Sequence, residues 1–120
     1  MRKVQFLGLE DSDKDIIVSF AIGKSPGDIV SLILHRQLFY EELMEEEERG
    51  VHVSLENENI SDNELNMLCD FKLSGNEIEI KSTLRSYKLD VSSIEKEEID
   101  EMLDLLKKQN YDNRFSLVSV

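Results

Sequence analysis

The side chains that most often perform catalysis or hold a metal ion are few in this chain. Its two histidines, His35 and His52, have no cysteine and no second histidine at the spacing of a zinc site. The one cysteine, Cys69, follows Met67 and Leu68 in an apolar stretch, which favours a buried structural thiol over a nucleophile paired with a histidine. We therefore expect no metal site, no cofactor and no catalytic residue.

Three aspartates, Asp11, Asp13 and Asp15, have the spacing that opens a calcium-binding loop. Ile16 then stands where such a loop needs glycine, and Ile22 where it needs a bidentate glutamate. A solvated turn is therefore favoured over a weak cation site. The chain also lacks a glycine-rich phosphate loop and a G-x-S-x-G nucleophile elbow, so an enzyme, as an alternative, would need a pocket of carboxylates with shifted pKa values.

Acidic residues dominate the charge of the chain. Asp and Glu number 26 against 14 Lys and Arg, which gives a formal net charge of −12. Nucleic acids and anionic membranes are bound mainly through lysine and arginine, so we expect neither as a partner. The charge favours a basic protein as the partner, or alternatively serves solubility alone.

Length and residue usage are typical of one soluble domain. A chain of 120 residues can bury a core without a metal or a disulfide, and its one proline and five glycines argue against long linkers. A lone cysteine fits a reducing compartment. We expect no signal peptide after Met1, because Gln5, Gly8 and Glu10 interrupt the apolar residues there, and the most apolar stretch, 29–34, is far shorter than the roughly 20 residues of a membrane span. We expect a single cytoplasmic domain over residues 1–120.

The start of the chain predicts a β-hairpin with arms at 3–9 and 15–22, because Val4 and Phe6 alternate with polar or small residues and the second arm is a nearly continuous β-branched run typical of a central strand. Ser25-Pro26 then has the chemistry of a helix start, because serine caps a helix well and proline suits the first helical position. We expect this helix to run from Pro26 to about residue 48. Gly50 would be the left-handed residue after its end.

The second half of the chain predicts a strand, a second hairpin, a second helix and a closing strand. These elements are expected at 51–55, at 65–73 with 77–84, from Ser92-Ser93 to about 109, and at 115–120. Ser92 and Glu95 have the spacing of a capping box. The predicted order is ββαβββαβ, an α+β fold in which two helices pack on a mostly antiparallel sheet.

The predicted first helix carries two features that suggest a binding surface. Glu41, Glu42 and the glutamates at 45–48 crowd its last turns, where they oppose the helix dipole and repel one another. A basic partner would relieve this repulsion, and a solvated acidic tip is the alternative. Leu34 and Leu38 fall on the polar side of the same helix, where they either contact a partner or lie under a neighbouring element.

The segment Glu41-Glu42-Leu43-Met44-Glu45-Glu46-Glu47-Glu48, the acidic loop after Leu55 and the hairpins resemble the general class of bacterial immunity proteins, which bind and neutralise nuclease toxins. The resemblance implies tight binding of a toxin through acidic side chains, or through pairing of a toxin strand with a sheet edge. Secretion-type chaperones, which are small, acidic and usually dimeric, and DNA-mimic proteins are alternatives. The residues expected at the partner surface are Glu41, Glu42, Glu45, Glu46, Glu56, Glu58, Leu34 and Leu38.

Overall fold

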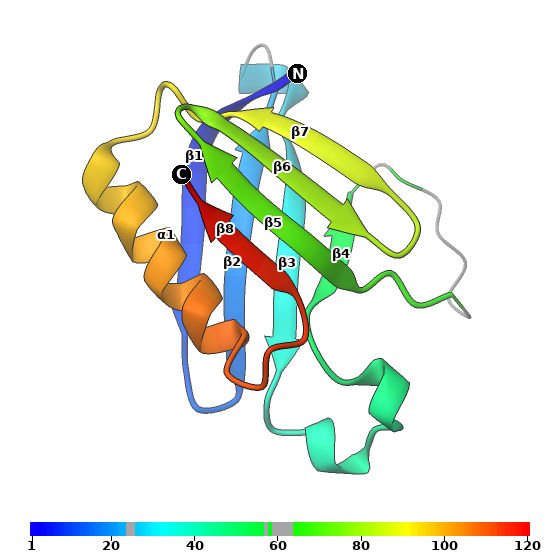
Figure 1. The fold of residues 1–120 in the computed structure, drawn as a ribbon. Helices are drawn as coiled ribbons and strands as arrows, with labels where there is room; N and C mark the ends of the chain where they lie inside the picture. Colours follow the sequence, from blue (N-terminus) through cyan, green and yellow to red (C-terminus); the bar gives the residue numbers. More distant parts are fainter. Residues whose placement is uncertain (24–25, 57, 59–63) are drawn as a thin grey trace.

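Strands make up most of the regular structure in residues 1–23, 26–56, 58 and 64–120, the part of the chain that the computed structural model describes (Figure 1). The strands are β1 (Arg2–Asp11), β2 (Asp15–Ile22), β3 (Val30–Gln37), β4 (His52–Leu55), β5 (Leu68–Ser74), β6 (Glu77–Ser82), β7 (Ser86–Asp90) and β8 (Ser116–Ser119). The helices are α1 (Lys96–Gln109) and three 3₁₀ helices, η1 (Pro26–Asp28), η2 (Glu41–Leu43) and η3 (Glu46–Glu48).

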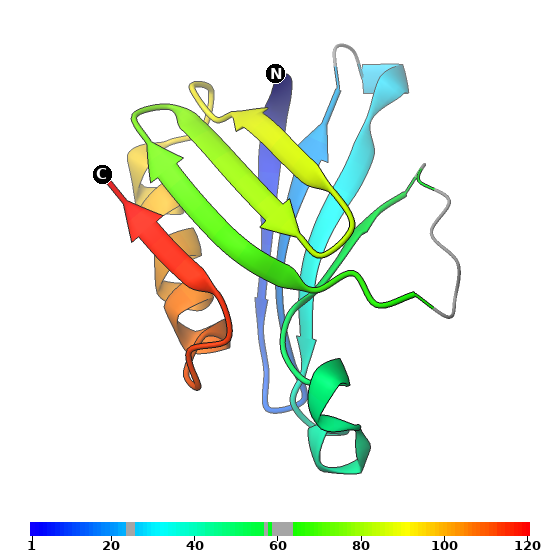
Figure 2. The same cartoon turned by 45° about the vertical axis from the view of Figure 1, so that its right-hand side comes forward.

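The eight strands form one mixed sheet that folds over on itself. Their order is β4-β3-β2-β1-β7-β6-β5-β8, and all neighbours are antiparallel except the β1–β7 and β5–β8 pairs. β1 to β4 form one layer, and β5 to β8 lie across it as a second layer (Figure 2). The apolar face of each layer is therefore turned toward the other.

The two layers are joined at two corners. At one corner β1 pairs with β7 through Arg2 and Lys3 alone. At the other, His52 of β4 bridges to Met67, and the N–H of Val53 donates to the carbonyl of Asn66 at 2.8 Å. α1 packs against β1 and β2 and covers part of the remaining opening.

The core lies between the layers because alternate residues of each strand point inward. Phe20 of β2 and Phe71 of β5 are both fully buried, and their ring centroids lie 6.5 Å apart across the interface of the layers. α1 adds Met102 and Leu106, which are also fully buried. Close packing of these side chains holds the two layers and the helix together.

The predicted helix over 26–48 is wrong, and the α+β arrangement with two helices on a mostly antiparallel sheet is corrected with it. Pro26 opens only the short η1, and the chain then enters β3, which pairs with β2 over eight residues. The apolar residues at 29–40 fit both a helical and a strand period, and pairing with β2 and β4 decides for the strand. Leu34, placed on the polar side of a helix, is instead fully buried in the core.

Most other predicted elements are confirmed. β1 and β2 form the first hairpin, and β5 and β6 form the second around Gly75, whose φ of 60° suits the turn. α1 begins at Lys96 with Glu95 as its N-cap and no side-chain cap bond, so the Ser92–Glu95 capping box is not formed. No helix in the described part of the chain is long and apolar enough to cross a membrane.

Candidate functional site

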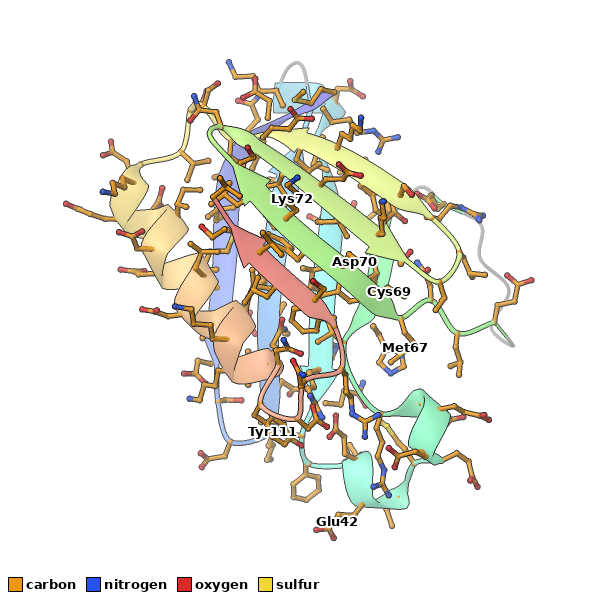
Figure 3. The ribbon with its side chains drawn as sticks, in the orientation of Figure 1. Glu42, Met67, Cys69, Asp70, Lys72 and Tyr111 are labelled. Carbon is orange, nitrogen blue, oxygen red and sulfur yellow. The ribbon has the colours of Figure 1, made fainter. Side chains whose placement is uncertain are left out.

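The connection between β3 and β4 projects from the lower end of the molecule in Figure 1. This connection contains η2, to which Glu42 belongs, and η3. Tyr111, from the loop after α1, lies beside the connection (Figure 3). We call residues 39–48 together with Tyr111 the acidic lobe. Its glutamates stand among four exposed apolar or aromatic side chains, namely Phe39, Tyr40, Leu43 and Tyr111.

The acidic lobe is anchored to the fold by a buried arginine. Arg36 takes the fourth inward position of β3 and is fully buried. Its Nε and Nη2 donate to the two carboxylate oxygens of Glu41 at 2.7 and 2.9 Å. Gly50, with a φ of 122°, turns the chain so that its N–H also donates to Glu41, at 3.4 Å. Bidentate pairing of this kind fixes the direction of the chain as it leaves β3.

The same arginine binds the end of α1. Its Nη1 donates to the carbonyl of Gln109 at 2.6 Å and to Asp112 at 2.7 Å, and its Nη2 donates to Asp112 at 2.9 Å. Its guanidinium also lies 4.3 Å from the ring centroid of Tyr111. The positive charge therefore stands at the negative end of the helix dipole, where it is favourable.

A second arginine ties the acidic lobe to the loop after α1. Arg114 donates to Glu46 at 2.7 Å and to Asp112 at 2.5 Å, so charges of alternating sign run from Glu41 through Arg36, Asp112 and Arg114 to Glu46. Such a network holds the backbone of the acidic lobe in place while many of its side chains remain exposed.

The carboxyl groups of this network have shifted pKa values. Burial acts to raise the pKa of Glu41, but the hydrogen bonds and charge of Arg36 outweigh burial and hold that pKa below its usual range. Hydrogen bonding to Arg36 lowers the pKa of Asp112 well below its usual range, against the opposing effect of burial. Both groups are thus stabilised as anions in the folded chain.

The network predicts a loss of stability in acid. Because Glu41 and Asp112 have lower pKa values in the folded chain than in the unfolded chain, their contribution is present above about pH 4 and is lost as the pH falls through their folded values. Urea unfolding between pH 7 and pH 2.5 measures this decline. The Glu41→Gln/Asp112→Asn variant should show a shallower decline, and an equally steep one would contradict the assignment.

The exposed part of the acidic lobe combines carboxylates with aromatic rings. Among the described residues, no lysine or arginine forms an ion pair with Glu42, Glu45 or Glu47. The rings of Phe39 and Tyr40 are 61% and 54% exposed and meet edge to face with centroids 4.9 Å apart. Leu43, between these groups in sequence, is 85% exposed. The surface thus offers rigid apolar area beside unpaired negative charge.

The structure separates the eight residues that the sequence assigned to one partner surface. Glu42 and Glu45 are exposed on the acidic lobe, whereas Glu41 is buried against Arg36, and Glu46 is exposed but bound to Arg114. The remaining four are in other environments. They are Leu34 in the core, Leu38 half-buried after β3, Glu56 exposed past the end of β4, and Glu58, whose carboxylate accepts from Arg85 and Tyr87.

Sequence reasoning missed the aromatic half of the site and its anchor. Phe39, Tyr40 and Leu43 fall within the predicted helix over 26–48, which does not form, and they were given no role in binding. Arg36 was given no role, although it continues the alternation of inward residues along β3. Arg36 stands two residues after Leu34, so in a strand it points to the same buried face. This spacing is the signal that could have identified it as a buried charge that requires acidic partners.

The histidines, the cysteine and the three aspartates near the start of the chain, which could have served catalysis or metal binding, lie outside the acidic lobe. Asp15 binds His35 at 2.6 Å, and Asp11 binds Lys108 at 2.7 Å, so two of the aspartates of the β1–β2 connection have partners within the chain. Cys69 is half-buried, and burial raises the pKa of its thiol. In the described part of the chain no three His, Cys, Asp or Glu side chains are grouped to hold a metal ion.

A search of family models, curated proteins and solved structures finds no match to this chain. The role of the acidic lobe is therefore inferred from its own side chains.

Proposed function

We propose that the protein is a cytoplasmic inhibitor that binds a basic protein partner through the acidic lobe, in the manner of a bacterial immunity protein. One observation carries the proposal: exposed rings, and carboxylates without an ion-pair partner among the described residues, stand together on a segment that an ion network centred on the buried Arg36 ties to the fold. The partner class that fits is a positively charged protein such as a nuclease toxin.

The exposed rings supply the contact area that such an interface needs. Aromatic side chains bury much surface while losing little conformational freedom, and they are enriched at the centres of protein interfaces. Phe39, Tyr40 and Leu43 are all more than half exposed within five residues of chain. A partner that covered them would bury apolar area on the same segment that carries the exposed glutamates.

Charge supplies the selectivity. The net charge of −12 gives the whole molecule an attractive field for cations, and Glu42, Glu45 and Glu47 add local negative charge beside the rings. Arginine and lysine on a partner would meet both carboxylates and ring faces there. Lys14 already lies over the ring of Phe39, with its Nζ 5.7 Å from the centroid, which shows that this ring accepts a cation.

The two alternative binding classes have less support from the structure. A secretion-type chaperone needs an exposed apolar groove for a client or for a second copy, but Leu34, one of the two leucines expected at a partner surface, is buried in the core. A DNA mimic needs rows of carboxylates along one face. On the outer face of β5 and β6, lysines pair across the strands with acids instead, as Lys72 does with Glu79 and Lys81 with Asp70.

Charge reversal on the acidic lobe should slow association with the partner. In the Glu42→Lys/Glu45→Lys/Glu47→Lys variant we expect the association rate constant at low salt to fall by about tenfold or more, because electrostatic steering is reversed where contact is made. The matched control, Asp100→Lys/Glu101→Lys/Asp104→Lys, makes the same change in net charge on the exposed face of α1. Equal effects of the two variants on the rate would contradict a specific role for the lobe.

Affinity capture from the native host identifies the partner for that measurement. Wild-type protein and both triple variants are immobilised, washed at low salt and eluted with a salt gradient. We expect one stoichiometric basic protein, retained by the wild type and the α1 variant and lost from the lobe variant. Many weakly held proteins, captured equally by all three, would contradict the proposal.

A further inference from the structure

A second feature of the molecule lies at the end opposite the acidic lobe. A cavity of about 450 Å³ is lined by residues from the N-terminal end of β1, from η1 and from the end of β4. Its volume falls within the roughly 300–1,000 Å³ range of small-ligand sites, which often occupy the open ends of β-barrels and similar sandwiches. The residues that matter for its chemistry are Arg2, Lys3, Ile22, Asp28, Val30 and Leu55.

The floor of the cavity is apolar and firmly placed. Ile22 and Leu55 belong to the core and are 3% and 5% exposed, and Val30 opens β3 beside them. Gly23 follows Ile22, and a Cβ there would lie 2.5 Å from the carbonyl oxygen of Asp28, so glycine lets η1 approach this closely. The wall is therefore fixed by backbone contacts.

The rim of the cavity carries cations that lack partners among the described residues. Arg36, Arg49, Arg85 and Arg114 each form an ion pair, whereas no described carboxylate lies within 4.0 Å of the charged nitrogens of Arg2. Because acids outnumber bases in this chain, an arginine with no carboxylate partner among the described residues is available to bind an anion. Arg2 also borders a smaller adjoining cavity of about 230 Å³.

The acids near the cavity do not cancel this charge. Glu58 lines both cavities, but its carboxylate already accepts from Arg85 at 3.1 Å and from the hydroxyl of Tyr87 at 3.3 Å. Asp28 also lines the cavity, and Asp90 lies opposite Lys3 in the β1–β7 pair, so acids stand close to Lys3. Arg2 is therefore the cation of the rim that remains without a carboxylate partner among the described residues, above an apolar floor.

We propose that this cavity binds a small amphipathic anion, with its acidic group at Arg2 and its aliphatic body against Ile22, Val30 and Leu55. Arginine binds a carboxylate or a phosphate through paired hydrogen bonds, and the apolar floor gains from burying a hydrocarbon chain. A free fatty carboxylate and the anionic end of a lipid share this chemistry. The site is distinct from the acidic lobe and does not depend on the inhibitor function.

Decanoate, below its micelle concentration, is the probe for this site. Calorimetry should show one site per chain, and amide resonances of Ile22, Val30 and Leu55 should shift on titration. Acetate has the charge without the chain and decanol has the chain without the charge, so each should bind about tenfold more weakly or worse. Vesicles of anionic phosphatidylglycerol distinguish the two possible ligands. Binding to the vesicles would indicate that the site takes the anionic end of a lipid, and binding to decanoate alone would indicate a free fatty carboxylate.

Matched variants test the assigned residues. Arg2→Gln should weaken decanoate binding by about tenfold, the effect of losing one charge-assisted hydrogen bond. Lys72→Gln removes the same charge from the exposed face of β5 and should leave the affinity unchanged. The proposal would be overturned if wild-type protein bound no decanoate at millimolar concentration, or if the two variants lost affinity equally.

Discussion

Replacement of Arg36 by methionine should lower the free energy of unfolding by about 3–5 kcal/mol, because it leaves the buried carboxylate of Glu41 without its cation and removes one of the two arginines that bind Asp112. Arg36 is fully buried and donates to Glu41, to Asp112 and to the end of α1. Equilibrium unfolding in urea at pH 7 measures the change. Adding Glu41→Gln and Asp112→Asn to the same chain should recover part of the loss, since no unpaired anion then remains.

The control for this prediction is Arg85→Met. Arg85 also pairs with a glutamate, Glu58, at 3.1 Å, but its side chain is 44% exposed. Exposed ion pairs contribute little, so we expect a loss of at most about 1 kcal/mol. If Arg36→Met were as mild as this control, the network would not be the anchor of the acidic lobe.

Truncation of Phe71 to alanine should be about as severe, with a loss of about 3–5 kcal/mol in the free energy of unfolding. Phe71 is fully buried, and its ring stacks on Phe20 across the two layers, so its removal opens a cavity that neighbouring side chains fill only in part. Urea unfolding again gives the value.

Phe6→Ala is the matched truncation on the surface. The side chain of Phe6 is 57% exposed on β1, so its loss should change stability by roughly 0.5 kcal/mol or less. Phe71→Ala with a similarly small effect would mean that the two layers are not held together by this stack.

The elements that sequence reasoning placed correctly are those in which local and tertiary preferences agree. The first arm of the β1–β2 hairpin begins with alternating residues, the second is nearly continuously apolar and rich in β-branched residues, and a turn-rich stretch at 11–14 joins them. α1 carries one apolar stripe, with acids at its start and lysines at its end. Neither element needs knowledge of the rest of the chain.

The segment at 26–48 failed because its local signals point to a different structure from the one that packing favours. Ser25-Pro26 and the glutamates favour a helix, but Leu32 and Leu34 also alternate as a strand does. The strand is flanked by β2 and β4, which supply backbone hydrogen bonds on both sides. Such non-local pairing overrides propensity and is invisible in a short window of sequence.

Sequence reasoning found the glutamates of the site but not the distant residues that Arg36 brings to them. The glutamates were found because a run of like charges can be recognised without a fold, and Glu42 and Glu45 do lie on the acidic lobe. Tyr111 and Asp112 are more than 60 residues further along, and only the contacts of Arg36 bring them to Glu41. No spacing rule connects residues across that distance.

A rigid acidic lobe has a consequence for binding kinetics. The ion network fixes its backbone before any partner arrives, so association need not order the segment. Arg36→Lys keeps the charge but loses the fork that holds two carboxylates at once. We expect it to lower the affinity for the partner by shifting Glu41 and Tyr111, although no exposed residue is substituted.

Site-specific photocrosslinking tests the central claim most directly, because it reports which surface touches the partner inside the native host. A photoreactive phenylalanine analogue is placed at Leu43, which is 85% exposed on the acidic lobe, and in a second chain at Phe6, which is exposed on β1. We expect one basic protein to be crosslinked at Leu43 and not at Phe6. Crosslinking of the partner at Phe6 alone, or equally at both positions, would contradict the assignment of the acidic lobe as the binding surface.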